Sequence, residues 1–318
     1  MAGWGRVAVP APLLTRFHPC ALGFVDVMQL LSQVIVDSIL LSGLYTLLAV
    51  GLSLGFGVTR IINFAHGEFV MLGAYGAFWL FTLFKVDPLI SLPLIVVGGY
   101  FVGWLVFKIA VEKVLAAPHL NQILLMFGIH LVLQNIAVVL WTGDVRSAMP
   151  DYALSTWTFG DVFIIHGRLI AFAVATVMIG GLIGWLHFTE SGRAVRAVSQ
   201  NRDAAVLMGI NPVRMYALSF AANSALAAAT GVVVSFLINI TPFMGFSILL
   251  KALAIVILGG LGSVIGTLVG AVILAFSETT VAYYVPEGSG WAEGIAFALI
   301  IAILVVRPRG IAGESKET

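Results

Sequence analysis

The chain has 318 residues, of which 60% are hydrophobic and only 10% are charged, and its formal net charge is +1. A soluble globular domain carries about 25% charged residues, so this composition excludes a soluble protein and predicts an integral membrane protein. The small net charge, with no basic patch, argues against nucleic-acid binding. The single cysteine, Cys20, excludes an internal disulfide, and no Cys/His spacing typical of a metal site is present.

Residues 1–27 differ in composition from the rest of the chain. They contain three prolines and two arginines and lack the compact apolar segment and small-residue cleavage site of a signal peptide. A continuous apolar segment begins directly after Met28. We therefore predict that residues 1–27 are an N-terminal extension and that Met28 is the natural start. Peptides from before Met28 in the mass spectrum of the native protein would contradict this.

Apolar segments long enough for membrane crossings follow one another from residue 28 to residue 310. They lie at about residues 29–57, 61–84, 89–111, 120–141, 168–187, 214–240, 247–276 and 291–306. We predict an all-α integral membrane protein, a multi-span helical bundle with broken or re-entrant helices. Trp104, Trp141, Trp185 and Trp291 fall near segment ends, as interfacial anchors do.

Basic residues near segment ends predict the orientation, because cytoplasmic loops carry an excess of lysine and arginine. Connections around Asp144 to Asp161 and Glu278 to Glu293 are predicted to be exterior. Arg6 and Arg16 favour a cytoplasmic N-terminus. Counting back from the C-terminus with one crossing per segment instead places the N-terminus outside. A re-entrant segment at 61–84 would reconcile the two predictions. The predicted cytoplasmic parts contain Lys108, Lys113 and His119, the Arg193 to Arg214 loop, and a tail at 311–318 preceded by Arg307 and Arg309 and containing Lys316.

A polar block interrupts the second apolar segment at Asn63, His66 and Glu68. Such groups are costly at membrane depth unless they face protein or a water-filled path. Gly67 lies between them, at a place where a helix could break and redirect Glu68, and we predict that these four residues line or gate a translocation path. The alternative is a helix start, with Asn63 as a cap and Glu68 in the first turn. Both hold if the helix begins part-way into the membrane.

A polar loop at residues 188–213 separates two long apolar segments. It contains the helix-forming stretches RAVRAVSQ and DAAVLMG, followed by Gly209 and Pro212 as a stop signal. A short helix held just inside the membrane suits docking of a cytoplasmic partner. The alternative is an ordinary basic loop retained by its charge.

Glycine interrupts the seventh apolar segment in the sequence Gly259-Gly260-Leu261-Gly262-Ser263. We predict two short helices that meet at a glycine break, or a re-entrant hairpin. Small-xxx-small spacing predicts close helix packing at several further positions. Three isolated polar residues have simpler interpretations. We predict that Gln122 and His130 form interhelical hydrogen bonds and that the Lys251 side chain extends towards the membrane surface. The glycine pairs are Gly51/Gly55, Gly99/Gly103, Gly180/Gly184 and the series Gly262/Gly266/Gly270.

Three motifs together resemble the LivH-type permease of branched-chain amino-acid ABC importers. They are INFAHGEFVMLGAY at Ile62–Tyr75, GRAVRAVSQNRDAAVLMGI at Gly192–Ile210, and KALAIVILGGLGSVIGTLVGA at Lys251–Ala271. They follow the family's order, and the resemblance covers nearly all of the chain after Met28. It implies a multi-pass inner-membrane (plasma-membrane) protein that forms the transmembrane domain of an ABC importer.

The resemblance also implies a cytoplasmic coupling helix of the EAA type, which docks in a cleft of the ATPase. Asp203-Ala204-Ala205 followed by Gly209 has this form, with Asp in place of the usual Glu, and Arg196 and Asn201 belong to the same loop motif. The implied partners are a second related permease, two cytoplasmic ATP-binding subunits and a periplasmic substrate-binding protein. The chain itself needs no cofactor, since it has no G-x-x-x-x-G-K-[ST] phosphate loop.

Other functions fit the sequence less well. Relatives within the same class import urea, short amides or aromatic acids, and the binding protein would set most of the specificity. An intramembrane enzyme could use His66 and Glu68 as a metal or acid–base pair, but the chain has no H-E-x-x-H or G-x-S-x-G motif. A channel or proton-coupled transporter would need intramembrane charges in series. Glu68 has almost no other intramembrane charge to form such a series, which argues against both functions.

Overall fold

The computed structural model describes residues 24–160, 162–285, 288–306 and 310–311. Almost all of the predicted N-terminal extension, and the tail with Arg307, Arg309 and Lys316, lie outside these residues. The described chain is a helical bundle with seven helices long and apolar enough to cross a membrane, which confirms the predicted all-α membrane architecture. The helices are α1 (Phe24–Thr59), α2 (His66–Phe84), α3 (Pro88–Val106), α4 (Glu112–Val114), α5 (His119–Trp141), α6 (His166–Phe188), α7 (Glu190–Gln200), α8 (Arg202–Leu207), α9 (Pro212–Leu237), α10 (Met244–Gly259), α11 (Val264–Tyr284) and α12 (Gly288–Val306), with a π-helical turn η1 (Phe107–Val111) and a 3₁₀ turn η2 (Asp151–Ala153).

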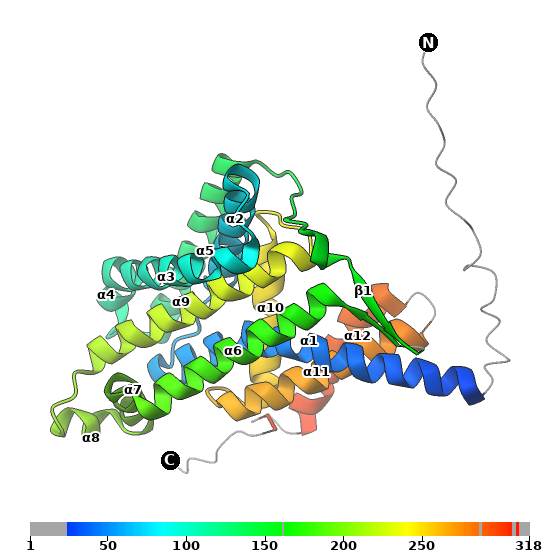
Figure 1. The fold of residues 1–318 in the computed structure, drawn as a ribbon. Helices are drawn as coiled ribbons and strands as arrows, with labels where there is room; N and C mark the ends of the chain where they lie inside the picture. The colour runs from blue at the N-terminus through cyan, green and yellow to red at the C-terminus, as the bar shows by residue number, and fades with distance from the viewer. Residues whose placement is uncertain (1–23, 161, 286–287, 307–309, 312–318) are drawn as a thin grey trace.

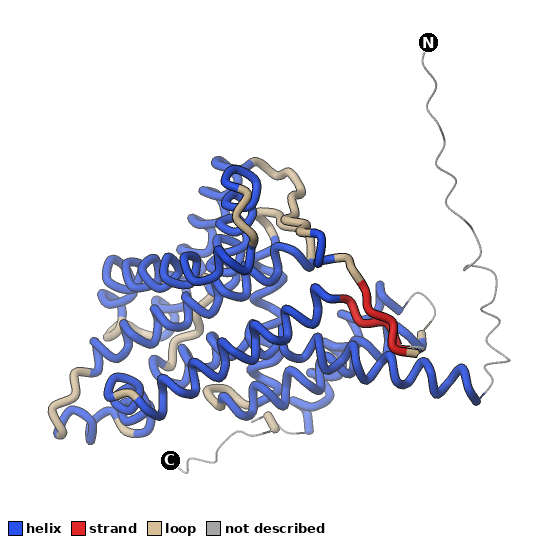
Figure 2. The backbone as a smooth tube through the Cα atoms, in the orientation of Figure 1, coloured by secondary structure: helices blue, strands red, loops and turns tan. Residues whose placement is uncertain are grey.

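One small β-hairpin was not predicted. Strands β1 (Thr156–Phe159) and β2 (Val162–Ile165) pair antiparallel in the connection before α6, and Figure 2 shows them at one end of the bundle, beside the first part of α1. Gln33 of α1 fixes the hairpin there, because its side-chain amide both donates to and accepts from the backbone of Phe163, at 2.9 and 2.8 Å.

The core forms around α1 and α9. Helix α9 is the most deeply buried of the seven candidate spans, and α2 and α3 pack on it through small residues. A Cβ at Gly73 or Gly99 would collide with Ala228, and one at Gly103 with Ser224, so the predicted Gly99/Gly103 pair does permit close packing by van der Waals contact. The predicted Gly180/Gly184 pair does not, because a Cβ at either position meets nothing within 4 Å.

The helix directions settle the path of the first two segments. Helix α1 runs from the hairpin end, at Gln33, to the end that carries α7 and α8, where Leu54 and Val58 lie beside Val195 (Figure 1). The predicted basic loops meet at that second end, since Lys108 and Arg214 line one groove. If that end is cytoplasmic, as the positive charges predict, α1 begins outside.

Segment 61–84 is therefore not re-entrant, which corrects the proposed reconciliation with a cytoplasmic N-terminus. After α1 the chain is non-helical from Arg60 to Asn63 and forms a turn before His66, where α2 begins. Helix α2 then runs to the hairpin end, where the Tyr152 hydroxyl donates to Asp87 directly after the helix, at 3.0 Å. The segment is thus a crossing with a non-helical beginning. Such backbone is tolerated at membrane depth when it is buried in protein, as Ile61 and Asn63 are.

The seventh segment is two helices, as one of the predicted alternatives stated. Helix α10 ends at Gly259 and α11 begins at Val264, and α10 crosses the direction of α1, α6 and α9 steeply (Figure 1). Glu278 does not lie in an exterior loop, because α11 continues to Tyr284. The apolar sequence of α11 simply extends past this single acidic residue.

Candidate functional site

The predicted polar block forms the buried start of α2. Asn63 does not occupy the capping position itself; its Oδ1 accepts a hydrogen bond from the Ala65 amide at 3.0 Å, which shapes the turn before the helix. His66 Nε2 lies 2.8 Å from the carbonyl oxygen of Leu48. Leu48 is 11 residues before the end of α1 (59 − 48), or about 16 Å along the helix axis. The helix therefore starts well inside the bundle, which agrees with the predicted helix start part-way into the membrane.

Glu68 contacts a different part of the bundle from His66. Its Oε1 lies 2.9 Å from Nδ1 of His130 in α5, and both side chains are buried. Phe127 and Phe246 flank the imidazole, with ring centroids 5.5 and 5.6 Å away. An acid at this depth requires a partner, and His130 supplies it. His130 therefore lies beside an acidic residue of another helix, a contact that the sequence analysis did not foresee.

Gly67 is not a hinge, which corrects the prediction that the helix breaks there. Helix α2 is regular from His66 onward. A Cβ at Gly67 would collide with the backbone of Gly245 at the start of α10, and a Cβ at Gly245 would collide with the Glu68 carboxylate. The two glycines thus allow the beginnings of α2 and α10 to touch beside Glu68.

A second buried polar cluster joins α1, α10 and α11. Lys251 Nζ lies 3.2 Å from Glu278 Oε1, and the Tyr45 hydroxyl donates to the other carboxylate oxygen of Glu278. Lys251 also donates to the Tyr45 hydroxyl at 3.2 Å. Lys251 is therefore turned inwards and not towards the membrane surface as predicted, because Glu278 is buried beside it and compensates its charge.

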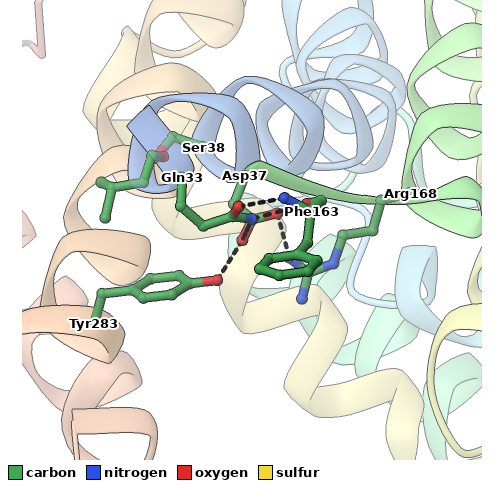
Figure 3. Close-up of polar contacts among 7 residues, drawn as sticks. Gln33, Asp37, Ser38, Phe163, Arg168 and Tyr283 are labelled. Atoms are coloured by element: carbon green, nitrogen blue, oxygen red, sulfur yellow. Dashed lines mark hydrogen bonds and ion pairs between the residues drawn. The ribbon is translucent and has the colours of Figure 1, made fainter. Parts of the chain in front are cut away.

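A third polar cluster ties the hairpin end together (Figure 3). Asp37 of α1 lies 2.8 Å from Arg168 of α6 and accepts a hydrogen bond from the Tyr283 hydroxyl of α11 at 2.6 Å. Gln33 donates to Asp37 at 3.0 Å and connects the cluster to the hairpin. Sequence analysis missed it, although an aspartate within the first apolar segment was a usable signal.

The polar loop folds into two short helices, α7 and α8. Asn201 caps α8, its Oδ1 accepting from the Ala204 amide at 3.0 Å, and Gly209 ends the pair with a φ of +80° that favours glycine. Asp203 and Ala204 are exposed, whereas Ala205 is only 4% exposed and packs into the bundle.

Two apolar residues at the tip of α8 were overlooked by sequence analysis. Leu207 and Met208 are 88% and 82% exposed, next to the buried Ala205. A helix that seats one side on its own bundle and presents adjacent large apolar side chains is suited to contact a partner. The signal was available in the sequence Val206-Leu207-Met208, which places three apolar residues in a polar loop.

The glycine break between α10 and α11 requires its glycines. Gly260 and Gly262 have φ values of +102° and +85°, a region where side chains with a Cβ are strained. Gly259 packs against the backbone of Gly266, and Gly262 against that of Gly57. Ser263 caps α11 by accepting from the Gly266 amide at 3.0 Å.

Of the three predicted site groups, the structure brings the coupling loop and the glycine break together and keeps the Asn63–Glu68 block apart. Arg196 of α7 lines one cavity with Gly262 and Ser263 of the glycine break. The Asn63–Glu68 block is not part of that cavity, because it lies further up α1, at the level of Leu48.

The chain matches the family described as "Branched-chain amino acid transport system / permease component" over residues 34–304. It belongs to this family. BraD, a high-affinity branched-chain amino acid transport system permease protein of Pseudomonas aeruginosa, is 31% identical over 89% of this chain and 95% of its own length. LivH of Escherichia coli K12 is 30% identical with the same coverage, and a probable LivH of Methanocaldococcus jannaschii is 30% identical over 88% and 92%. No solved structure matches.

As a member of this permease family, the chain is a multi-pass inner-membrane protein whose relatives are transport proteins. The alternative of an intramembrane enzyme required His66 and Glu68 to act as a pair. Their side chains point to different elements, because His66 faces α1 while Glu68 faces α5 and α10. Within the described residues, no group of three or more His, Cys, Asp or Glu side chains is placed to hold a metal ion.

Proposed function

We propose that this chain is the permease subunit of an ATP-driven importer of branched-chain amino acids. It works with a second related permease, two cytoplasmic ATP-binding subunits and a periplasmic substrate-binding protein. The family match over residues 34–304 and the names of the relatives support this proposal. The single structural observation that carries it is the α7–α8 pair, which presents Leu207 and Met208 at one end of the bundle.

We expect α8 to transmit ATPase closure to the membrane helices. Leu207 and Met208 contact the ATPase, with Asp203 and Ala204 on the exposed surface beside them. Asn201 caps the start of the helix, Gly209 turns the chain shortly after its end, and Ala205 seats it on the bundle. Arg196 lines the cavity between α7 and the glycine break. Coupling is only as large as the difference in contacts between the two states, so a helix that is firmly seated on its own bundle transmits movement best.

The start of α2 is the proposed gate. Asn63, His66 and Glu68 are buried, and Gly67 lets the start of α2, with Glu68, lie directly against α10. Helix α10 leads to the glycine break at Gly259–Ser263, near the coupling helices. A movement of the break would therefore shift the α2–α10 contact and change the surroundings of Glu68.

Replacing Glu68 by glutamine tests the gate. Glutamine keeps the size of the side chain and replaces the carboxyl group that lies 2.9 Å from His130 Nδ1, and a buried polar group left without a matching partner costs about 1–3 kcal/mol. We expect uptake to fall about tenfold or more while the complex still assembles. The measurement is uptake into proteoliposomes, normalised to the amount of complex. The control is Asn135→Ala, an exposed polar residue of α5, and equal uptake by both variants would leave the block as a helix start only.

Reconstitution tests the substrate. The purified complex, with ATP on the ATPase side and its binding protein on the other, should accumulate radiolabelled leucine, isoleucine or valine against a gradient. Urea and a short amide serve as comparison substrates. Accumulation of urea without leucine would contradict the proposed substrate class, and ATP hydrolysis without uptake of any compound would contradict import.

A further inference from the structure

A cavity of about 380 Å³ lies between helix α7 of the polar loop and the glycine break that precedes α11. It is bounded by the last turns of α1 and α6, by α7, and by the start of α11. Its lining is mainly apolar on the α1, α6 and α11 sides and polar on the α7 side. The lining residues are Leu54, Gly57, Val58, Ile183, Leu186, His187, Val195, Arg196, Ser199, Gln200, Gly262, Ser263, Val264 and Ile265.

The ionisable groups of this cavity favour an anion. Arg196 and His187 are its ionisable residues, and none of the described residues that line it is acidic. The Nε of Arg196 is buried and has no hydrogen-bond partner among the described residues. A buried donor without a partner costs free energy, and a guanidinium matches the geometry of a phosphate. The start of the 21-residue helix α11 adds a positive field at Ser263.

The position of the cavity favours a lipid over a soluble anion. Gly57 and Val58 lie within the last three residues of α1, Leu186 within the last three of α6, and Val264 is the first residue of α11. All three helices are long enough to span the membrane, so the cavity lies near the level of the headgroups. Basic pockets between membrane helices on the cytoplasmic side bind acidic headgroups, and the apolar walls suit the beginning of an acyl chain.

We infer that this cavity binds an anionic phospholipid, with its phosphate on Arg196 and the start of α11 and one chain along Leu54, Ile183 and Ile265. Such a lipid contacts α7 and the glycine break at the same time. It would therefore connect the coupling loop to the membrane helices, in addition to the contacts that α7 itself makes with these helices.

Native mass spectrometry of the complete detergent-purified complex tests this inference. Phosphatidylglycerol is titrated against the wild type, Arg196→Ala, Arg196→Lys and the control Arg193→Ala, which removes an exposed arginine of the same helix. We expect Arg196→Ala to bind phosphatidylglycerol about tenfold more weakly, since a charge-assisted hydrogen bond has about this effect. Arg196→Lys should bind with intermediate affinity because lysine lacks the planar fork, and Arg193→Ala should bind like the wild type.

Three further measurements distinguish the source of the phosphate. Ile183→Trp fills the apolar part and leaves Arg196 in place, so it should also weaken lipid binding. Phosphatidylcholine should bind more weakly than phosphatidylglycerol, and inorganic phosphate should not displace the lipid. Equal binding by Arg196→Ala and the wild type would overturn the inference. So would displacement by inorganic phosphate, or no retained lipid in the wild-type complex, which would indicate a soluble anion or a partner subunit in the cavity.

Discussion

Gly67→Ala is expected to lower both the yield and the thermal stability of the folded permease. The new methyl group would collide with the carbonyl oxygen of Gly245, and backbone on both sides prevents relief by a rotamer change. Alanine gains about 1 kcal/mol of helix propensity over glycine. Forcing an added methyl group into tightly packed structure costs about 1–3 kcal/mol and occasionally more, and a clash with backbone belongs at the upper end. We therefore expect the steric cost to dominate.

The measurement is the yield of monodisperse permease in detergent and its thermal unfolding temperature. Gly98→Ala in α3 is the matched control, because a Cβ there meets nothing within 4 Å. This control should fold as well as the wild type or slightly better. If Gly67→Ala gave the same yield and melting temperature as Gly98→Ala, the α2–α10 contact would not be as close as the structure shows.

Leu207→Asp is expected to uncouple the importer while leaving the permease intact. Leu207 is 88% exposed, so a charge there should not disturb the bundle. At an ATPase interface the same charge would remove an apolar contact, and truncation of such an anchor costs about 2 kcal/mol or more. The complex should insert and purify, but loaded binding protein should no longer stimulate its ATP hydrolysis.

Leu154→Asp is the matched control, an exposed leucine at the hairpin end of the bundle. It should leave the ATPase contact unchanged. Normal stimulation of Leu207→Asp would place the coupling interface elsewhere. Ala205→Glu and Gly209→Val test the same helix less cleanly, since Ala205 is buried in the bundle and Gly209 has a φ of +80°. Both changes would damage α8 itself as well as any contact with a partner.

The sequence alone determined the class, the approximate segments and the family of this protein. Membrane spans are readable from sequence because about 20 apolar residues are needed to cross a bilayer. Glycine breaks and caps are local features, so the boundary between α10 and α11, and the end of α8 shortly before Gly209, followed from residue type. The family motifs at Ile62–Tyr75, Gly192–Ile210 and Lys251–Ala271 carried the identification.

Only the tertiary structure decided which polar groups meet. Lys251 and Glu278 each look like single charges near segment ends, but the steep crossing of α10 and the full length of α11 place them together beside Tyr45. The partner of Glu68 lies 62 residues away (130 − 68) on α5, and no local pattern predicts that distance. Gly67 looked like a hinge because glycine permits both bending and close approach. The choice between them depends on Gly245, which only the packing of α10 places against it.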